Sequence, residues 1–339
     1  MYRSGKVAFL FFILFPAVGF AQIDSLFNKF TFLQTEYDTN YVKKGLSDWA
    51  VHLYLQNRNN SFSSQDQARH QSVYFDPLTN MTLGAGGSYK NFSLDFGFPI
   101  HNNEGDTAHA TGLDFSTSLF VGQHVSDMGF RRFRGYYVSG YDSVQNELRS
   151  VFRSDIATAN LYLNYLYNFN YRRFSFNASF IGREMQIKSA GAPLAGFFFS
   201  YMDLHANEPV VPPEFDIYYG SSIRISEANL WTLGLMGGYA YTFVLPARFY
   251  LTLSLVPGLA FTTGEVKSDV YYEIGEPVEV SFKLISKNAF GYSGKRFYGY
   301  LSSTTDRYWL RLSKEDQFKN NLSRWRFLVG YLINKTDKR

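Results

Sequence analysis

Large apolar side chains alternate with small or polar ones along much of the chain. In one such segment Trp231, Leu233 and Leu235 fall on one face, and Thr232 and Gly234 fall on the other. A repeat of two residues is that of a β-strand with one apolar face. The same alternation, of Phe, Tyr or Leu with Ser, Thr, Gly or Asn, runs through 91–100, 111–121, 173–182, 249–259 and 325–333. The pattern therefore predicts a protein built from β-strands.

The alternation predicts twelve strands joined by links of two kinds. Short links lie at 90–91, 122–126, 170–172, 244–246 and 293–295. Most of the other links are long, above all 184–227, then 58–77 and 263–281. Short turns at one end, long loops at the other and an even strand count are the pattern of an outer-membrane β-barrel. The predicted strands are 48–57, 78–90, 91–100, 110–121, 127–139, 155–169, 173–183, 228–243, 247–262, 282–292, 296–312 and 321–333.

The composition of the two strand faces separates a membrane barrel from a soluble β-protein. In a soluble secreted sandwich or barrel, the apolar face points inward and the other face is solvated. Here the second face is more often small and uncharged than charged, and rings such as Tyr167, Phe243 and Tyr331 lie near predicted strand ends. Aromatic girdles of a membrane barrel have that arrangement. We therefore expect an all-β, transmembrane antiparallel β-barrel of about 12 strands (roughly 10–14), with short periplasmic turns and long extracellular loops.

Two segments depart from simple alternation. In 127–139, Arg132 and Arg134 fall on the apolar face, so the three arginines of this segment cannot all avoid lipid unless the strand contains a bulge or the turn is longer. In 296–312 the apolar residues change face midway. This change predicts a bulge or break near 302–306, or two shorter strands.

The N-terminal residues 1–21 have the features of a secretory signal peptide. Arg3 and Lys6 precede the apolar run of nine residues at 7–15, and small residues stand near Ala21. At ~1.5 Å per residue this run is far shorter than a bilayer core of ~30 Å. No later stretch approaches the ~20 apolar residues of a spanning helix. We expect a signal peptide at 1–21, a periplasmic lead-in at 22–47, the barrel at 48–333 and a basic periplasmic tail at 334–339.

The composition excludes several classes of protein. The 34 Phe and 26 Tyr supply too much apolar surface for a disordered chain. Because there is no Cys, a disulfide scaffold, a lipoprotein anchor and a cysteine-ligated metal site are excluded. Without Arg3 and Lys6, the 33 Lys and Arg fall to 31 against 29 Asp and Glu, so the charge does not predict binding to nucleic acid.

His124 and Ser126 are the one pair with catalytic spacing. Both side chains share a strand face, where an imidazole can activate a hydroxyl, as in lipid hydrolases of the outer membrane. No carboxylate has an evident claim to orient His124, and the pair falls in a predicted periplasmic turn. An ordinary turn His and Ser is the favoured interpretation, with the hydrolase as the alternative. The other histidines lack metal-ligand spacing, so no metal or cofactor is predicted. The run Gly84–Gly87 is expected to ease curvature or close packing.

The predicted loop 184–227 is the best candidate for a functional segment. It is much longer than the usual ~4–6 residues, and it is partly apolar. Such a loop can constrict the lumen, cap the barrel mouth, hold a partner or contribute extra strands. Its charged residues can form a basic rim, although exposed charge is the ordinary explanation. The candidate residues for lumen or loop function are Arg183, Lys188, Phe197, Phe198, Phe199 and Arg224.

A set of short segments in a fixed order resembles a known family. These segments are Gly135-Tyr136-Tyr137, Arg153-Ser154-Asp155-Ile156 leading to Asn160, Gln186-Ile187-Lys188-Ser189-Ala190-Gly191 and Phe197-Phe198-Phe199. The order is similar to that of a Bacteroidetes outer-membrane β-barrel family catalogued as a domain of unknown function. The likeness covers about Trp49 to Ile333, and it implies location and fold but no activity.

The function that the sequence predicts is that of a non-enzymatic barrel in a Gram-negative envelope. We expect either a porin-like small-solute channel or a structural envelope component, with 184–227 constricting or capping the lumen. Its expected partners are outer-membrane lipid and a small polar solute, without nucleic acid, and no protein partner is identified. The alternatives are a lipid hydrolase that uses His124 and Ser126, and a soluble secreted β-barrel or sandwich that binds a ligand.

Overall fold

The computed structural model describes most of the chain after its N-terminal segment. Tyr37–Arg339 form one compact unit, and Met1–Glu36 form another, of which only Glu36 is described. The predicted signal peptide and basic tail lie outside the described residues. The described residues are 36–44, 47, 49–66, 71–77, 81–89, 92–100, 111–142, 147–212, 225–268, 272–311 and 316–333.

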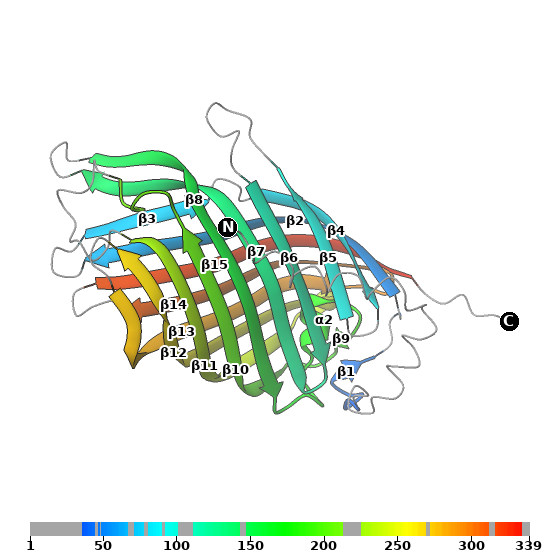
Figure 1. Cartoon of the computed structure of the whole chain (residues 1–339). Coiled ribbons are helices and arrows are strands. Elements are labelled where there is room, and N and C mark those ends of the chain that lie inside the picture. Colours follow the sequence, from blue (N-terminus) through cyan, green and yellow to red (C-terminus); the bar gives the residue numbers. More distant parts are fainter. Residues whose placement is uncertain are drawn as a thin grey trace, which may run out of the picture. The chain divides into compact units, whose positions relative to one another are not determined.

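Twelve antiparallel strands of the described residues close into a ring (Figure 1). The last strand pairs with the first along its whole length, from Asp316 opposite Asp66 to Ile333 opposite Trp49. The prediction of a barrel of about twelve strands is confirmed. The ring contains β2 (Trp49–Asp66), β4 (Met81–Tyr89), β5 (Phe92–Pro99), β6 (Thr111–Val121), β7 (His124–Asp142), β8 (Glu147–Asn168), β10 (Ala190–His205), β11 (Ile225–Val244), β12 (Phe249–Ser268), β13 (Tyr272–Ser293), β14 (Phe297–Arg311) and β15 (Asp316–Ile333).

The two ends of the barrel differ in their connections. At one end, the turn end, short links at 90–91, 122–123, 245–248 and 294–296 join neighbouring strands, and β2 begins beside the end of β15. In barrels of this class the short turns are periplasmic. The opposite end, the loop end, is therefore the extracellular one.

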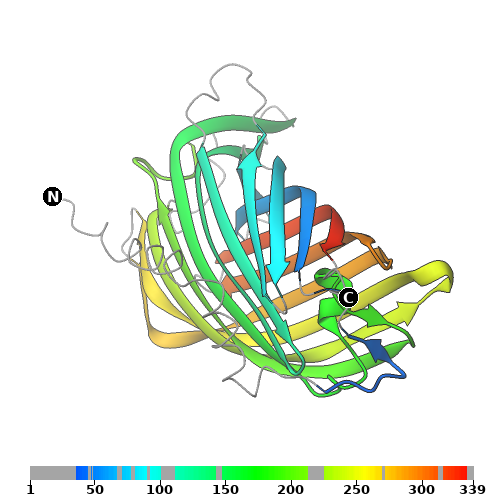
Figure 2. The ribbon, with the colours of Figure 1, turned by 90° about the vertical axis from the view of Figure 1, so that its right-hand side faces the viewer.

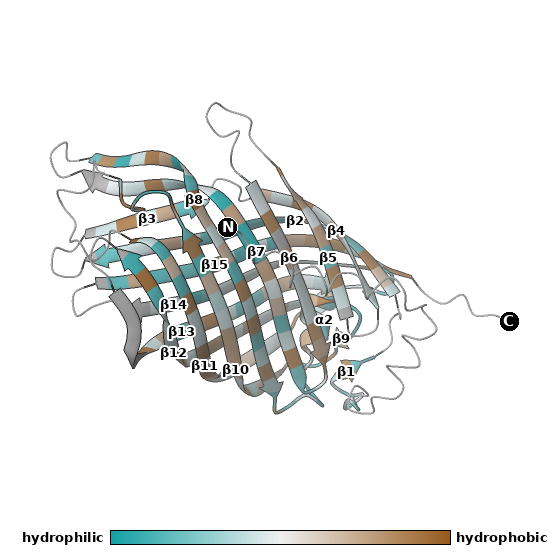
Figure 3. Cartoon of the chain, in the orientation of Figure 1, coloured by the Kyte–Doolittle hydropathy of each residue, from teal (hydrophilic) through white to brown (hydrophobic). Residues whose placement is uncertain are grey.

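The outer surface of the ring is apolar. Figure 3 shows apolar and polar residues alternating along the strands, and the apolar residues on the predicted face are exposed. Because this face points outward, the soluble secreted alternative is wrong, and the chain is an integral β-barrel of the outer membrane. The described residues contain no helix with the length and hydropathy of a membrane crossing. Exposed residues of this surface include Leu53, Leu83, Phe96, Phe98, Leu113, Leu233, Leu235, Leu255, Leu259, Phe261, Phe327 and Val329.

Two predictions about the middle of the chain are wrong. The predicted strand 173–183 contains the helix α2 (Phe176–Phe180), because the Ser175 hydroxyl accepts a hydrogen bond from the Ala178 N–H and starts a helical turn. The predicted loop 184–227 contains the strand β10. Because one predicted strand is replaced by the plug and one strand was not predicted, the count of twelve strands is unchanged. The long extracellular connection is shorter than predicted and covers 206–224.

An additional strand, β3 (Gln71–Pro77), narrows the loop end. It pairs with the loop-end part of β2 and with the loop-end part of β7, whereas β4 and β6 occupy these positions nearer the turn end. The predicted irregularity in 127–139 is confirmed as a register shift in β7 at Gly135, whose φ is 91°. The shift turns Tyr136 into the lumen and leaves Arg132 and Arg134 exposed outside.

The predicted irregularity in 296–312 is not found. β14 keeps an unbroken register with β13 and with β15. Tyr308 faces inward, and it packs against an apolar cluster inside the barrel. The apolar residues change face because the lumen itself becomes apolar toward the loop end, and not because the strand is broken.

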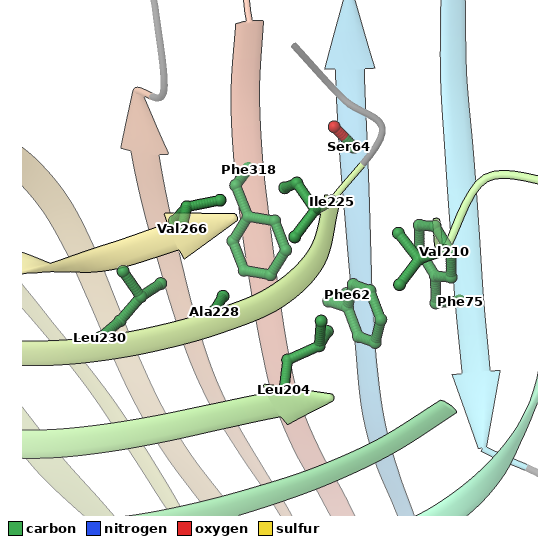
Figure 4. Close-up of a pocket in the computed structure, with 10 residues that line it drawn as sticks. All are labelled: Phe62, Ser64, Phe75, Leu204, Val210, Ile225, Ala228, Leu230, Val266 and Phe318. Carbon is green, nitrogen blue, oxygen red and sulfur yellow. The ribbon is translucent and has the colours of Figure 1, made fainter. Parts of the chain in front are cut away.

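An apolar cluster, the loop-end seal, fills the lumen beneath the extracellular mouth (Figure 4). The rings of Phe62 and Phe75 stack with centroids 4.3 Å apart, and Phe318 lies against Phe62 at 5.6 Å. The cavity among these side chains measures about 10 Å³, which is room for about one water molecule. The seal consists of Phe62, Val73, Phe75, Phe133, Tyr136, Val138, Ile156, Met202, Leu204, Ala206, Val210, Val211, Ile225, Ala228, Leu230, Val266 and Phe318.

The link between β8 and β10, residues 169–189, forms a plug at the turn end. Its helix α2 lies on the inner side of the strands (Figure 2), where Phe174, Phe176 and Ile181 join an apolar cluster with side chains of the wall. The Tyr300 hydroxyl donates to the Phe180 carbonyl at 2.7 Å, which fixes the helix to β14. The plug also contains β9 (Met185–Gln186), which pairs with β1 (Val42–Lys43) of the N-terminal segment. The loop end of the lumen is thus filled by apolar packing. At the turn end, the plug packs its rings against the wall but leaves a cavity of about 210 Å³, lined by Ser179, Gln186 and Tyr250 among other residues.

We expect a charge on the lipid-facing wall to destabilise the barrel according to depth. Leu235 lies midway along β11 and is 68% exposed, so Leu235→Arg should lower the free energy of unfolding by ~2–4 kcal/mol. Phe243 lies near the turn end of the same strand, so Phe243→Arg should cost only about 0–1 kcal/mol for the charge. Urea titration in lipid vesicles measures both. Equal costs for the two variants would contradict the outward orientation of this wall.

The plug should also make stability depend on pH through Glu184. Burial raises the pKa of the Glu184 carboxyl above its usual range, although a hydrogen bond from Ser175 opposes the shift. A raised pKa means that the folded state holds the proton more tightly, so stability falls as the pH rises from the ordinary glutamate pKa to the raised one. Glu184→Gln should remove this slope, whereas Glu208→Gln, which alters an exposed side chain at the loop end, should keep it. Urea midpoints across this pH range provide the test, and a slope that persists in Glu184→Gln would refute it.

Candidate functional site

A belt of charged side chains crosses the lumen between the loop-end seal and the plug. Because lipid surrounds the barrel, charged side chains on these strands are favourable only where they point into the lumen. The belt residues accordingly share the inward face with Ser, Thr and Asn on their strands. The charged belt consists of His52 and Arg58 of β2, Asp95 of β5, Asp127 and Arg131 of β7, Lys283 and Lys287 of β13, Asp306 of β14, and Arg324 and Arg326 of β15.

Asp95 is the centre of the first group in the belt. One of its carboxylate oxygens lies 2.7 Å from His52 Nε2, and the other accepts from Arg326 Nη1 at 2.5 Å. Arg326 also donates to the Gln56 side-chain oxygen at 2.9 and 3.1 Å. A Cβ at Gly86 would lie 2.3 Å from His52 Nε2, so the glycine of β4 makes room for this group. The prediction that the glycine run serves close packing is confirmed at this position.

Two lysines of β13 pair with carboxylates of other strands. Lys283 Nζ lies 3.0 Å from an oxygen of Asp306, and Lys287 pairs with Asp127. Asp127 also accepts from the Ser118 hydroxyl at 2.7 Å. These pairs are buried, so each depends on its partner to offset the desolvation of the charge.

Three arginines form the third group. Arg58 donates to the Ser116 hydroxyl at 3.4 Å, and Arg131 lies over the ring of Tyr162, 5.2 Å from its centroid. Arg324 is the register partner of Arg58 across β15 and β2. The group therefore concentrates positive charge in one part of the belt.

Two small cavities open between these groups. One is lined by His52, Asp95 and Arg326, and the other by Arg131, Tyr162 and Asp306, among other residues. Each measures about 30 Å³, which is room for about two water molecules. The described residues contain no group of His, Asp or Glu that can hold a metal ion. The arrangement has room for a very small ion.

His124 and Ser126 lie on the outer wall of β7 at the turn end. The phenol of Tyr165 lies 2.7 Å from His124 Nδ1, in the place that a carboxylate takes in a catalytic triad. The two side chains share a face as predicted, because neighbouring Val125 points into the lumen.

The candidate residues of 184–227 do not come together. Arg183 belongs to the plug, where its guanidinium donates to the Ser47 carbonyl, and Lys188 is exposed at the turn end. On β10, Phe197 faces outward, while Phe198 is buried under Lys283, whose Nζ lies 4.1 Å from the ring centroid. Phe199 takes the same side as Phe197, and Arg224 lies outside the described residues. No basic rim is therefore found among the described members of this set.

The lumen is closed by residues on either side of β10 in the sequence. Val210 and Val211, which follow β10, are buried in the loop-end seal, and the residues before β10 belong to the plug. Sequence reasoning missed the charged belt, because the inward face was judged by its many Ser, Thr and Gly. The belt could have been found from the positions of residues such as Arg324, Arg326 and Lys287 in the two-residue repeat. Each of them falls on the strand face opposite to that of the lipid-facing side chains.

Solved structures with similar chain traces are membrane β-barrels. The translocator domain of the autotransporter NalP from Neisseria meningitidis aligns at 13% identity over 85% of this chain and 89% of that chain, with a TM-score of 0.40. The outer membrane protease OmpT from Escherichia coli aligns at 7% identity over 87% and 100%, with a TM-score of 0.35. OprG, an outer membrane protein of Pseudomonas aeruginosa, aligns at 10% identity over 88% and 100%, with a TM-score of 0.26. These similarities assign no activity to this chain.

The sequence itself matches one family model. No match is found among curated proteins. Residues 36–332 match the model described as Domain of unknown function (DUF4421), which covers the whole ring of strands and the plug. The resemblance seen in the sequence is thus confirmed as to family, and the chain belongs to this family of domains of unknown function.

Proposed function

We propose that this protein is a non-enzymatic structural component of the outer membrane, a barrel whose lumen is sealed at rest. The observation that supports the proposal is the filling of the lumen at two levels. The loop-end seal leaves a cavity of about 10 Å³, and the plug packs Phe174 and Phe176 against the wall at the turn end. A hydrated solute has no path of its own size through the loop-end seal.

The apolar character of the loop-end seal strengthens the proposal. An ion that enters the seal must give up its water in a place that offers aromatic and aliphatic side chains, and such transfer of an unpaired charge is very costly. The buried pairs of the belt connect five strands, which suits a rigid component of the envelope. The phenol of Tyr165 lies at His124 Nδ1, where a catalytic triad has a carboxylate, and this favours the non-enzymatic role over the lipid hydrolase.

A gated channel for a small polar solute is the second candidate. The charged belt favours it, because these side chains would line a polar passage if both apolar layers moved aside. The plug is a single link between β8 and β10, so it can leave the lumen without breaking a strand pair of the ring.

Conductance in planar bilayers separates the two candidates. The wild-type protein should show no current steps, because the loop-end seal is filled. Three variants extend the test: replacement of 174–182 by a Gly-Ser linker, the triple change Phe62→Ser, Phe75→Ser and Phe318→Ser in the seal, and the two combined. Each single variant should stay silent, because the other layer persists.

The combined variant then decides between the candidates. Current from the combined variant alone would support the gated channel, and silence would support the structural role. Wild-type current would overturn the sealed barrel. The matched control is Phe96→Ser, Phe98→Ser and Phe261→Ser, which removes three outward-facing rings and should not open the lumen. Heat-modifiable migration on gels verifies that each variant has folded.

A further inference from the structure

The two cavities of the charged belt adjoin one another inside the sealed lumen. They share Ser118, Asp127, Lys287, Thr304 and Arg324 in their linings. Each is about 30 Å³ in volume, so each can take one or two particles of the size of water. Charged and hydroxyl side chains line both, so they differ from the dry voids that apolar packing leaves.

The linings of the two cavities do not balance in charge. The cations are Arg131, Lys287, Arg324 and Arg326, and the carboxylates are Asp95, Asp127 and Asp306. Each of these three carboxylates already pairs with a cation other than Arg324. Lys283, which pairs with Asp306, and Arg58, which adjoins Arg324, both add to the positive side.

Arg324 is a cation that lines both cavities without a carboxylate partner among the described residues. Asp95 is engaged by Arg326, and Asp127 by Lys287, and no hydrogen bond or ion pair joins Arg324 to another described residue. Its nearest charged neighbours across the strands include Arg58, which has the same sign. A cation held inside a membrane barrel without a counter-charge is costly.

Thr304 supplies a second donor at the same place. Thr304 is the register partner of Arg324 across β14 and β15, and both side chains line both cavities. Its hydroxyl has no hydrogen bond to a described residue. A guanidinium and a hydroxyl that face one small space are donors for an anion.

We infer that a monovalent halide, which is chloride under ordinary conditions, binds in this space between Arg324 and Thr304. One negative charge offsets Arg324, which has no ion pair with a described residue, and a halide is a single atom that fits in either cavity. Phosphate or a carboxylic acid has more atoms than the space accepts. The sealed ends mean that the ion enters while the barrel folds and stays inside afterwards. The site does not depend on whether the barrel conducts.

Bromide identifies the site directly, because it scatters anomalously and differs little from chloride. Wild-type protein, refolded and crystallised in sodium bromide, should show one anomalous peak between Arg324 and Thr304. Arg324→Gln should lose the peak, and Arg132→Gln, which removes an arginine from the outer wall, should keep it. A site filled by water alone in the wild type would overturn the inference.

The folding equilibrium provides the solution test. Above its dissociation constant, a tenfold rise in chloride at constant ionic strength, with gluconate as the replacement, should raise the ratio of folded to unfolded protein about tenfold. Arg324→Gln should remove this dependence, and Arg324→Lys should retain it in part. Thr304→Val, which keeps the side-chain shape and removes the donor, should weaken it and covers the case in which Arg324→Gln fails to fold. Equal dependence in wild type and Arg324→Gln, or none in the wild type, would refute the site.

Discussion

The structure depends on one constraint, which is that a strand inside lipid must find hydrogen-bond partners for its backbone on both sides. A sheet meets this condition only by closing, and here β15 pairs with β2 over the full length of both strands. Closure then divides every strand into an outer and an inner face. The outer face must be apolar, and therefore charge on the strands is directed into the lumen. The charged belt follows from the same closure that makes the barrel possible.

The interior is not a uniform aqueous pore, because the polarity of the side chains inside the barrel changes along its axis. Aromatic and aliphatic side chains fill the lumen near the loop end and again around α2, and the charges lie between them. Enclosure between two apolar layers keeps bulk water from the belt, so each charge depends on a fixed partner. Asp95, Asp127 and Asp306 each pair with a cation, and Arg324 has no ion pair with a described residue. The seals and the incomplete pairing together make an internal counter-ion reasonable.

Much of the barrel could be predicted from sequence, because lipid imposes a strict period of two on the strands that face it. Leu233, Leu235 and Phe98 were assigned to the outer face on this ground, and they are exposed. The same rule failed at 173–182, where Phe alternates with Ser and Asn but the rings pack against the inside of the wall. A two-residue repeat shows that a segment has one apolar face, but it does not show whether that face contacts lipid or other side chains. Two local signals distinguished the plug from the strand β10. In the plug, Ser175 caps α2, and in β10 small residues precede Phe197.

The sequence alone determined the class of the protein: its strands, its membrane exterior and the family to which it belongs, since each is set by local alternation or by residues in order along the chain. Only the tertiary structure decided what fills the lumen. Arg58 and Arg324 are separated by most of the chain and become neighbours because β15 returns to β2. Phe62 and Phe318 meet for the same reason, inside a narrowed mouth that β3 completes. Contacts across a closed ring depend on strand order and register, and no local pattern of residues encodes them.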